Sequence, residues 1–476
     1  MYYIIMNKFI KIFVILIFST SILFANGSTD NNTDTAVVSS PNTEIIQDNI
    51  NNIAYLYQVI DALSINEIDN DKALEGMASG LLDSLGDEYS FYVSADESAE
   101  YEEQSTGLYS GIGTYLTKKN PKVVDTKEDK TEKDYYVKIS SPFPGGPADR
   151  AGLKANDYIT HIDGEAVDSL NATEASLKLR GEAGTQVVVT VLRGSKSFDI
   201  TLTRATVETP TTVKSIINNH IGYIQIYQFT PGTAEQFTKD IKDLLKDNID
   251  SLVIDLRNNR GGVVDAALNI ADLFLANDTI LITQQKETLQ NSVQITKATP
   301  NTIVNDNFKI VLLVNGGTAS SSEILTGALK DNNRALIIGS KTFGKGIMQQ
   351  TFPFGKGYVQ FTIAHYLTPN SIDIHEKGIE PDIEIEEEIF QDDEIPIFEE
   401  LMESNKVIDF VDKNPIYSYE NLEKFADEIN NDKLNRTALL ILVRNEYLSR
   451  MDFEDRPVYD LDLDKALQEA VIQLEK

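Results

Sequence analysis

The spacing of apolar residues changes several times along the chain, and each change marks a different kind of segment. From Thr43 apolar residues recur at helical intervals, and a second helical pattern runs from Asp71 to Leu85. From about 108 to 207 the period shifts towards two, with short β-like runs between turn residues and helix candidates at 147–153 and 172–179. These patterns predict an all-helical N-terminal module followed by a small β-barrel with two helices.

Strands and helices alternate between residues 221 and 385. Apolar runs predict strands at 222–229, 252–256, 310–314, 335–338 and 358–366, and helical segments at 234–245, 265–275 and up to Leu329 separate them. Regular succession of strand, turn and helix predicts a largely parallel α/β core. Helical periodicity returns near the C-terminus, around 437–448 and 463–474.

The first 25 residues have the pattern of an export signal. Lys8 and Lys11 precede an apolar run from Ile12 to Phe24, which is shorter than a comfortable membrane span. Without cleavage near Ala25 the segment would remain as a membrane anchor. We therefore expect an exported, periplasmic or otherwise extracytoplasmic protein, either released or membrane-anchored.

The chain of 476 residues thus divides into six parts. Residues 1–25 form a signal peptide or N-terminal anchor, and the polar residues 26–42 form a flexible linker. The remaining parts are an N-terminal helical region at 43–105, the β-barrel at 106–206, the α/β core at 207–385 and an acidic helical C-terminal region at 386–476.

The charge and the residue composition exclude several kinds of partner and of reactive group. The net charge of −32 argues against nucleic acid as a partner, because phosphate binding needs clustered Lys and Arg. The acidity is uneven, since residues 386–476 contain 25 acids and 10 bases, a net of 10 − 25 = −15. Cysteine is absent and only four histidines occur, which excludes disulfides, thiolate nucleophiles and Cys-based zinc sites.

Thr-Ala-Ser-Ser-Ser-Glu at 318–323 is the first stretch with candidate chemistry. It lies between a predicted strand and a predicted helix, where a serine hydroxyl would meet free N–H groups and the positive end of the helix dipole. A serine at a helix start is also an ordinary N-cap, and Glu323 would complete a capping box.

Phe-Gly-Lys-Gly at 343–346 is the second stretch. Burial would lower the pKa of the Lys345 amine, and a neutral amine can accept the proton of a serine. A lysine on a surface turn is the alternative interpretation. Residues 339–345 approach a phosphate-binding loop, but Gly346 replaces the required Ser or Thr, so nucleotide binding is excluded.

Asp-Leu-Arg-Asn-Asn-Arg-Gly-Gly at 255–262 is the third stretch. Gly261 and Gly262 follow a buried strand and would let backbone amides approach a ligand closely, as an oxyanion hole requires. The same glycines are also explained by a turn that needs positive φ.

Together the three stretches resemble the carboxy-terminal processing proteases, or tail-specific proteases, which are serine peptidases with a PDZ domain. The resemblance implies a crotonase/ClpP-like α/β protease core. Ser320 would be the nucleophile, Lys345 the general base and Gln349 the residue that positions the lysine. Amides of Gly261, Gly262 and Ser321 would form the oxyanion hole.

The sequence departs from the family pattern in three places. Thr318 and Ser321 replace Ser and Ala beside the nucleophile, Arg260 stands where proline or glycine is usual, and the Gly-Arg pair after Pro369 is missing. Three adjacent serines therefore leave the identity of the nucleophile open.

The β-barrel segment resembles a PDZ domain. The resemblance rests on Tyr-Ser-Gly-Ile-Gly at 109–113 and on residues 147–157, and it assigns 106–206 to this domain. Gly111, Ile112 and Gly113 would supply the loop that holds a peptide C-terminal carboxylate while the peptide adds as a strand. Residues 84–90 resemble the junction that precedes the domain in the family.

Two other kinds of site were weighed. A Ser-His-Asp triad would need a histidine near Ser320, and His365 is the candidate; a packed or surface imidazole is the other interpretation. His-Glu-x-x-His spacing is absent, so metalloprotease chemistry is excluded, and we expect no metal and no cofactor.

The sequence therefore favours an exported serine endopeptidase that binds polypeptides with apolar C-termini and cleaves them through a Ser-Lys acyl-enzyme mechanism. The alternative is a non-catalytic protein on the same fold that binds peptides or apolar ligands. The apolar stripes of the helical ends fit either a homo-oligomer or packing within one chain, and residues 1–25 would provide any membrane association.

Overall fold

The computed structural model describes residues 43–98, 101, 103, 106–118, 135–143, 145–287, 289, 292–385, 394–429, 434–451 and 456–476. The predicted signal segment and linker, 1–42, lie outside the described residues. The described residues divide into two units, one up to Asn70 and the other from Asp71 onwards. In the first unit, helix α2 spans Thr43–Leu63. Among the helices of the described residues, none has the length and apolar character needed to cross a membrane.

A six-stranded sheet forms the centre of the α/β core. Its strand order is β10-β11-β12-β15-β16-β19, and every neighbouring pair except β10–β11 is parallel. The strands are β10 (Thr212–Ile217), β11 (Ile221–Ile226), β12 (Ser251–Asp255), β15 (Lys309–Val314), β16 (Leu336–Gly339) and β19 (Ile383–Glu384). The predicted parallel α/β core is thereby confirmed.

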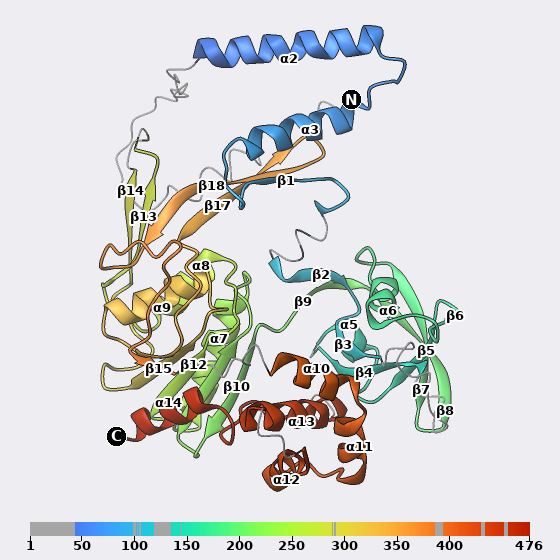
Figure 1. Cartoon of the computed structure of the whole chain (residues 1–476), viewed down its shortest axis with the longest axis vertical. Helices are drawn as coiled ribbons and strands as arrows, with labels where there is room; N and C mark the ends of the chain where they lie inside the picture. The colour runs from blue at the N-terminus through green and yellow to red at the C-terminus, as the bar shows by residue number, and fades with distance from the viewer. Residues whose placement is uncertain are drawn as a thin grey trace. The chain divides into compact units, whose positions relative to one another are not determined.

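Alternating side chains of this sheet enter two different hydrophobic cores. One face, which includes Ile254 and Leu312, packs against helices α7 (Thr233–Lys246), α8 (Val264–Asp272) and α9 (Ser321–Asp331). The opposite face, which includes Val253 and Leu313, packs against α14 (Lys465–Glu475). Figure 1 shows this last helix of the chain beside the sheet. The predicted C-terminal region, 386–476, is therefore not separate from the core, because its last helix, α14, covers one face of the core sheet.

A second sheet carries the segment around Lys345. Its path is β1-β18-β13-β14, and β17 pairs with β18. The strands are β1 (Phe91–Val93), β13 (Thr279–Gln285), β14 (Val293–Lys297), β17 (Ile347–Phe354) and β18 (Gly357–Leu367). Because β1 pairs with β18, the N-terminal region is not all-helical as predicted; it contains α3 (Asn70–Asp83) and then a strand of this sheet.

The segment predicted as a β-barrel forms an antiparallel sheet with two helices. Strands β3 (Thr114–Thr117), β4 (Val137–Pro142), β5 (Tyr158–Ile162), β7 (Gln186–Arg193) and β8 (Lys196–Thr203) follow in this order, and β6 (Glu165–Ala166) pairs with β5. Helices α5 (Pro147–Arg150) and α6 (Ala172–Leu179) contribute to its own hydrophobic core. Strand β2 (Leu108–Gly111), which comes before this sheet in the sequence, pairs with β9 (Ala205–Glu208), which comes after it.

Four further helices near the C-terminus have a core of their own. They are α10 (Ile395–Glu403), α11 (Lys406–Lys413), α12 (Tyr419–Ile429) and α13 (Arg436–Arg450), and Phe410, Phe425 and Val443 are buried among them.

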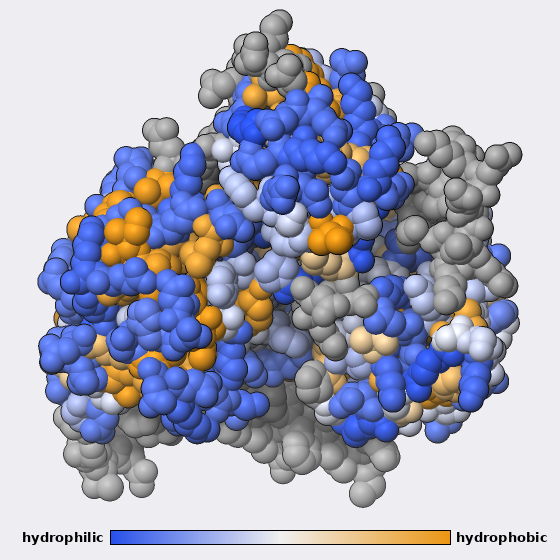
Figure 2. Space-filling model, turned by 90° about the horizontal axis from the view of Figure 1, so that it is seen from below, coloured by the Kyte–Doolittle hydropathy of each residue, from blue (hydrophilic) through white to orange (hydrophobic). Residues whose placement is uncertain are grey.

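Figure 2 shows one face of the molecule, on which hydrophilic residues surround several hydrophobic patches.

Candidate active site

Ser320 occupies a tight turn between strand β15 and helix α9. It is the N-cap residue of α9 and has φ 57° and ψ −120°, a left-handed conformation that costs energy for a residue with a side chain. The backbone N–H of Ser320 donates to Oε2 of Glu323 at 2.9 Å. The turn is therefore held in a strained shape by the first turn of its own helix, a combination common at functional sites.

The three adjacent serines have different roles. The hydroxyl of Ser321 donates to the Gly262 carbonyl at 2.7 Å, and that of Ser322 donates to the Asn259 carbonyl at 2.9 Å. Both side chains are fully buried, whereas Ser320 is half-buried. Among the three, Ser320 therefore has the hydroxyl best placed for reaction, and its neighbours tie the turn to the glycine loop.

The buried carboxylate of Glu323 links the Ser320 turn to the Lys345 segment. Oε2 accepts the backbone N–H groups of Ser320 at 2.9 Å and Lys345 at 2.8 Å. Oε1 accepts the N–H of Gly344 at 2.7 Å and the hydroxyl of Thr342 at 2.6 Å. Burial raises the pKa of Glu323, and these four hydrogen bonds act in the opposite direction. The sequence indicated Glu323 only as a capping residue; its spacing three positions after Ser320 was the available signal.

Lys345 lies just before strand β17, and its amine faces the ring of Tyr89. Nζ is 4.4 Å from the ring centroid, which is a cation–π contact. Burial lowers the pKa of Lys345, while the negative charges of Asp87 and Glu88 raise it. Among the hydrogen bonds of the described residues, none joins the side chains of Lys345 and Ser320. The two residues share the Glu323 carboxylate through their backbone N–H groups.

Gln349 does not contact Lys345 through a hydrogen bond in the part of the chain described. It lies in β17 directly opposite Thr362 of β18, and its Nε2 donates to the Thr362 hydroxyl at 3.3 Å. That hydroxyl donates in turn to Asp87 Oδ2 at 2.7 Å. Gln349 is therefore connected to the Asp87–Tyr89 segment that flanks the lysine.

The glycine loop lies against the Ser320 turn. A Cβ atom on Gly261 would lie 2.8 Å from Ser320 Cβ and 2.8 Å from the backbone nitrogen of Ser321, so only glycine fits there. The N–H of Gly261 already donates to Asn259 Oδ1 at 2.9 Å. The amides of Gly262 and Ser321 have no hydrogen-bond acceptor among the described residues. Of the three predicted oxyanion donors, these two are available to a ligand.

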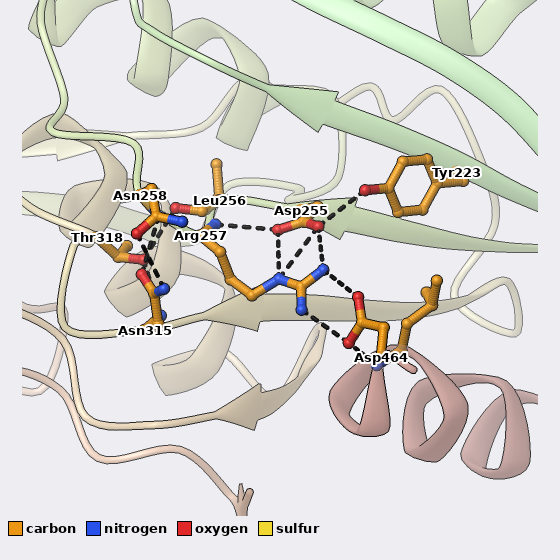
Figure 3. Close-up of polar contacts among 9 residues, drawn as sticks. Tyr223, Asp255, Leu256, Arg257, Asn258, Asn315, Thr318 and Asp464 are labelled. Carbon is orange, nitrogen blue, oxygen red and sulfur yellow. Dashed lines mark hydrogen bonds and ion pairs between the residues drawn. The ribbon is translucent and has the colours of Figure 1, made fainter. Parts of the chain in front are cut away.

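Asparagine and threonine side chains fix the start of the same loop. Asn258 and Asn315 form a reciprocal pair, in which Asn315 Oδ1 accepts the Asn258 N–H at 2.9 Å and Asn315 Nδ2 donates to Asn258 Oδ1 at 3.2 Å. Thr318 Oγ1 donates to the Leu256 carbonyl at 2.9 Å. Figure 3 shows these residues joining the ends of β12 and β15. The loops that carry Gly261 and Ser320 are thus linked at their bases.

The buried phenol of Tyr366 lies between the two predicted catalytic residues. Its hydroxyl donates to the backbone carbonyl of Lys345. Burial raises the pKa of Tyr366 well above its usual value, and a hydrogen bond with the Ser320 side chain acts in the opposite direction. Tyr366 is not predicted as a site residue from the sequence, because its local pattern is that of a core strand.

An open cleft of about 760 Å³ borders the Lys345 segment. It is lined by Leu85, Gly86, Asp87, Glu88, Tyr89, Phe343, Gly344, Ile347, Thr362, His365, His375 and Glu376. The exposed Phe343 and the carboxylates give it both apolar and acidic walls. A polypeptide chain could therefore approach Lys345 from this side.

His365 does not form a triad with Ser320 in the described structure. Its ring is 49% exposed, lies 5.6 Å from the ring of His375 and has Nδ1 3.9 Å from Asp373 Oδ2. Among the described residues no hydrogen bond joins it to Ser320. Nor do the described residues contain a group of three or more His, Asp and Glu side chains that could hold a metal ion.

The predicted carboxylate-binding loop of the β-barrel segment adjoins Tyr109. Gly111 ends β2, Ile112 is buried, and Gly113 has φ 70°. Burial raises the pKa of the Tyr109 phenol, while hydrogen bonds with the backbone of Thr114 and Gly113 act in the opposite direction. A Cβ on Gly111 would lie 2.9 Å from the Tyr109 ring. The tyrosine therefore lies directly against the loop.

Comparison with known proteins places these features in a family. A model of peptidase family S41 matches residues 220–385, and a PDZ model matches residues 138–193. The chain is 33% identical over 353 residues to a "Probable CtpA-like serine protease" of Staphylococcus aureus strain COL, covering 72% of this chain and 66% of the relative. A protein of the same name from Staphylococcus haemolyticus is 33% identical over 340 residues, covering 71% and 64%.

The alignments span just under two thirds of the length of these relatives. Among solved structures, a photosystem II D1 C-terminal processing protease is similar, with 28% identity and a TM-score of 0.41. That match covers 71% of this chain and 88% of the other.

Proposed function

Because the chain belongs to peptidase family S41 and contains a PDZ domain, we propose that it is an exported serine endopeptidase acting through Ser320 and Lys345. The observation that carries the proposal is the Glu323 carboxylate, whose Oε2 accepts the backbone N–H groups of both residues. One buried group thereby fixes the nucleophile turn and the segment of the base relative to each other. Such preorganisation is what an acyl-transfer site requires.

The proposed reaction is acyl transfer. The neutral amine of Lys345 takes the hydroxyl proton of Ser320, and Oγ forms a bond to the peptide carbonyl carbon. The amides of Gly262 and Ser321 stabilise the resulting oxyanion. Collapse breaks the C–N bond, and the Lys345 ammonium gives its proton to the leaving nitrogen. Water then attacks the ester with Lys345 again as base, which releases the acid product and restores the serine.

Burial of the amine and the side chain of Gln349 would prepare Lys345 to act as the base. Burial lowers the pKa of its amine, which favours the neutral form that can accept a proton. The amine must also turn from the Tyr89 ring towards Ser320. We propose that Gln349 holds the lysine after this movement, because Gln349 is anchored on Thr362 beside the Tyr89 segment.

We propose that substrates are polypeptides with apolar C-termini, held by Gly111, Ile112 and Gly113 of a PDZ domain at 106–206. The protease core would then be residues 207–385. Export through residues 1–25 belongs to the same proposal. The PDZ match at residues 138–193 and the acidic and apolar cleft beside Lys345 support a polypeptide substrate.

The test uses the full chain and an unfolded protein that carries an apolar C-terminal tail. Ser320→Ala and Lys345→Ala should each abolish cleavage. Ser449→Ala is the control, because this exposed serine of α13 donates its hydroxyl to the Glu446 carbonyl in its own helix, and it should retain wild-type turnover. Wild-type turnover in either dyad variant would overturn the proposed mechanism.

The non-catalytic alternative is kept open by one observation, the absence of a hydrogen bond between the Ser320 and Lys345 side chains in the described structure. Binding of tailed peptides without any Ser320-dependent cleavage would support it. Labelling of Ser320 by a fluorophosphonate would count against it, because labelling requires a reactive hydroxyl.

A further inference from the structure

Arg257 joins the α/β core to the C-terminal helix through two carboxylates. Its guanidinium contacts Asp255 with Nη2 2.6 Å from Oδ2, and it contacts Asp464 with Nη1 2.8 Å from Oδ1 and Nη2 2.6 Å from Oδ2. Figure 3 shows the guanidinium between the two acids, with the Tyr223 hydroxyl on the far side of Asp255. That hydroxyl donates to Asp255 Oδ2 at 2.8 Å.

The three charged side chains of this arrangement are mostly buried. The side chains of Asp255, Asp464 and Arg257 are 1%, 18% and 21% exposed, respectively. A bidentate pair between arginine and a carboxylate fixes both position and orientation, and removing one partner leaves a poorly solvated charge. Arg257 is therefore held from both sides, and only one of its partners belongs to the strand that precedes it.

Asp464 lies far from the active-site motifs in the sequence. It is 207 positions from Arg257 and outside the residues matched by the peptidase model. It is the N-cap residue of α14, where Oδ1 accepts the N–H of Leu467 at 3.0 Å. One carboxylate therefore both begins the helix that covers the sheet and holds the arginine.

Arg257 in turn starts the loop that carries the glycine turn. The next residue, Asn258, is paired with Asn315, and Asn259 accepts the Ser322 hydroxyl and the Ala319 N–H on its carbonyl. The loop ends at Gly261, which lies against Ser320 and Ser321. The loop backbone and the hydrogen bonds along it thus connect Arg257, and through it α14, to the amides proposed to stabilise the oxyanion.

We infer that Asp464 is a positioning residue for the glycine turn, acting through Arg257. This inference rests on the proposed function, since the turn matters for rate only if its amides hold a reaction intermediate. Asp464 does not touch the reacting atoms. The C-terminal helix is on this account part of the active-site support and not a detached acidic tail.

Asp464→Asn isolates the effect, because asparagine remains a good N-cap but lacks the charge that pairs with Arg257. The matched control is Asp462→Asn, an exposed carboxylate two residues earlier. We expect Asp464→Asn to lower kcat about 10-fold with little change in KM, since loss of a whole oxyanion donor costs roughly 100-fold or more. The control should match wild type. A kcat of Asp464→Asn equal to that of the control would overturn the inference.

A second measurement does not depend on activity. Hydrogen–deuterium exchange of the full chain, measured well below the melting temperatures of both variants, should be faster across residues 257–262 in Asp464→Asn than in Asp462→Asn. Equal exchange in the two variants would overturn the inference even if both cleave substrate. If wild type shows no Ser320-dependent cleavage, the proposed function fails, but exchange still decides whether Asp464 fixes the loop.

Discussion

The amine of Lys345 lies 4.4 Å from the ring centroid of Tyr89 and makes no hydrogen bond to Ser320 in the described structure. The ring stabilises the charged ammonium, whereas a general base must be neutral. Burial lowers the pKa of Lys345, and the carboxylates of Asp87 and Glu88 raise it. The segment before the PDZ domain therefore influences both the position and the charge of the proposed base.

The pH dependence of cleavage should report this influence. Neutral Lys345 is the active form, so kcat/KM should rise with pH as the ammonium loses its proton. Glu88→Gln removes a charge that raises the pKa of Lys345, so the acidic limb should move to lower pH by a few tenths of a unit, a small effect because Glu88 is exposed. The measurement is the pH profile of kcat/KM for variant and wild type.

Glu97→Gln is the control for this shift, because Glu97 is an exposed carboxylate in the same region that is absent from the groups acting on Lys345. Its profile should coincide with that of wild type. An acidic limb that stays in place in Glu88→Gln would contradict the assignment of Lys345 as the base.

Replacing Glu323 should loosen the connection between the Ser320 turn and the Lys345 segment. Glu323→Gln puts an NH2 group where one carboxylate oxygen now accepts two hydrogen bonds, so donors would face a donor. An unsatisfied buried donor costs about 1–3 kcal/mol. We expect kcat to fall at least about 10-fold and the melting temperature to drop by several degrees.

Glu235→Gln is the matched control, since it removes an exposed carboxylate from the first turn of another core helix, α7. It should change neither quantity. Full activity in Glu323→Gln would show that the carboxylate does not hold the Ser320 turn and the Lys345 segment in their working positions.

Local pattern identified the elements whose signals lie within a few residues. The predicted limits of α6, 172–179, agree with the structure, because an Asn171–Glu174 capping box begins the helix. Strand β1 was missed, since three residues carry no usable period and its partner, Tyr358–Gln360, is more than 260 residues away. Pairing over such distances depends on tertiary contacts that local spacing does not encode.

The same limit applies to the site. The motifs indicated the Ser320, Lys345 and Gly261 stretches, but the choice among three serines required the acceptors of their hydroxyls. The bond between Arg257 and Asp464 joins positions 207 residues apart, and an aspartate before a helix looks like an ordinary N-cap. What a side chain does besides capping is set by the surface against which its helix packs.

Gly261 and Gly316 provide a paired test of the oxyanion turn. An alanine Cβ at position 261 would lie 2.7 Å from the Ala319 carbonyl oxygen and 2.8 Å from Ser321 N, at a φ of 93°. At position 316 the nearest neighbouring atom, the Lys341 carbonyl oxygen, would be 3.9 Å away. Gly261→Ala should therefore lower kcat by roughly 100-fold, the scale of a lost oxyanion donor, whereas Gly316→Ala should stay within about 3-fold of wild type.

Steady-state kinetics with a tailed substrate, together with melting curves, would measure both variants. Equal kcat values for Gly261→Ala and Gly316→Ala in folded proteins would contradict the placement of the oxyanion site at this turn.

Tyr109 should compete with a bound peptide for the carboxylate loop. Burial raises the pKa of its phenol, hydrogen bonding to the backbone of Thr114 and Gly113 lowers it, and a C-terminal carboxylate would need amides of this same loop. Tyr109→Phe removes the oxygen and keeps the ring, which packs edge-on against Phe143. One hydrogen bond is worth about 0.5–1.5 kcal/mol, so a peptide with an apolar C-terminus should bind roughly 2- to 12-fold more tightly.

Tyr115→Phe is the control, because this ring also contacts Phe143, at 4.8 Å between centroids, but Tyr115 does not contribute to the loop hydrogen bonds of Tyr109. Calorimetric titration of the full-length chains with the free-acid peptide and its C-terminal amide would measure the effect. The gain should appear for the acid alone, since only a carboxylate fully uses the freed amides. An equal gain for both peptides, or none for either, would mean that Tyr109 does not occupy the carboxylate position.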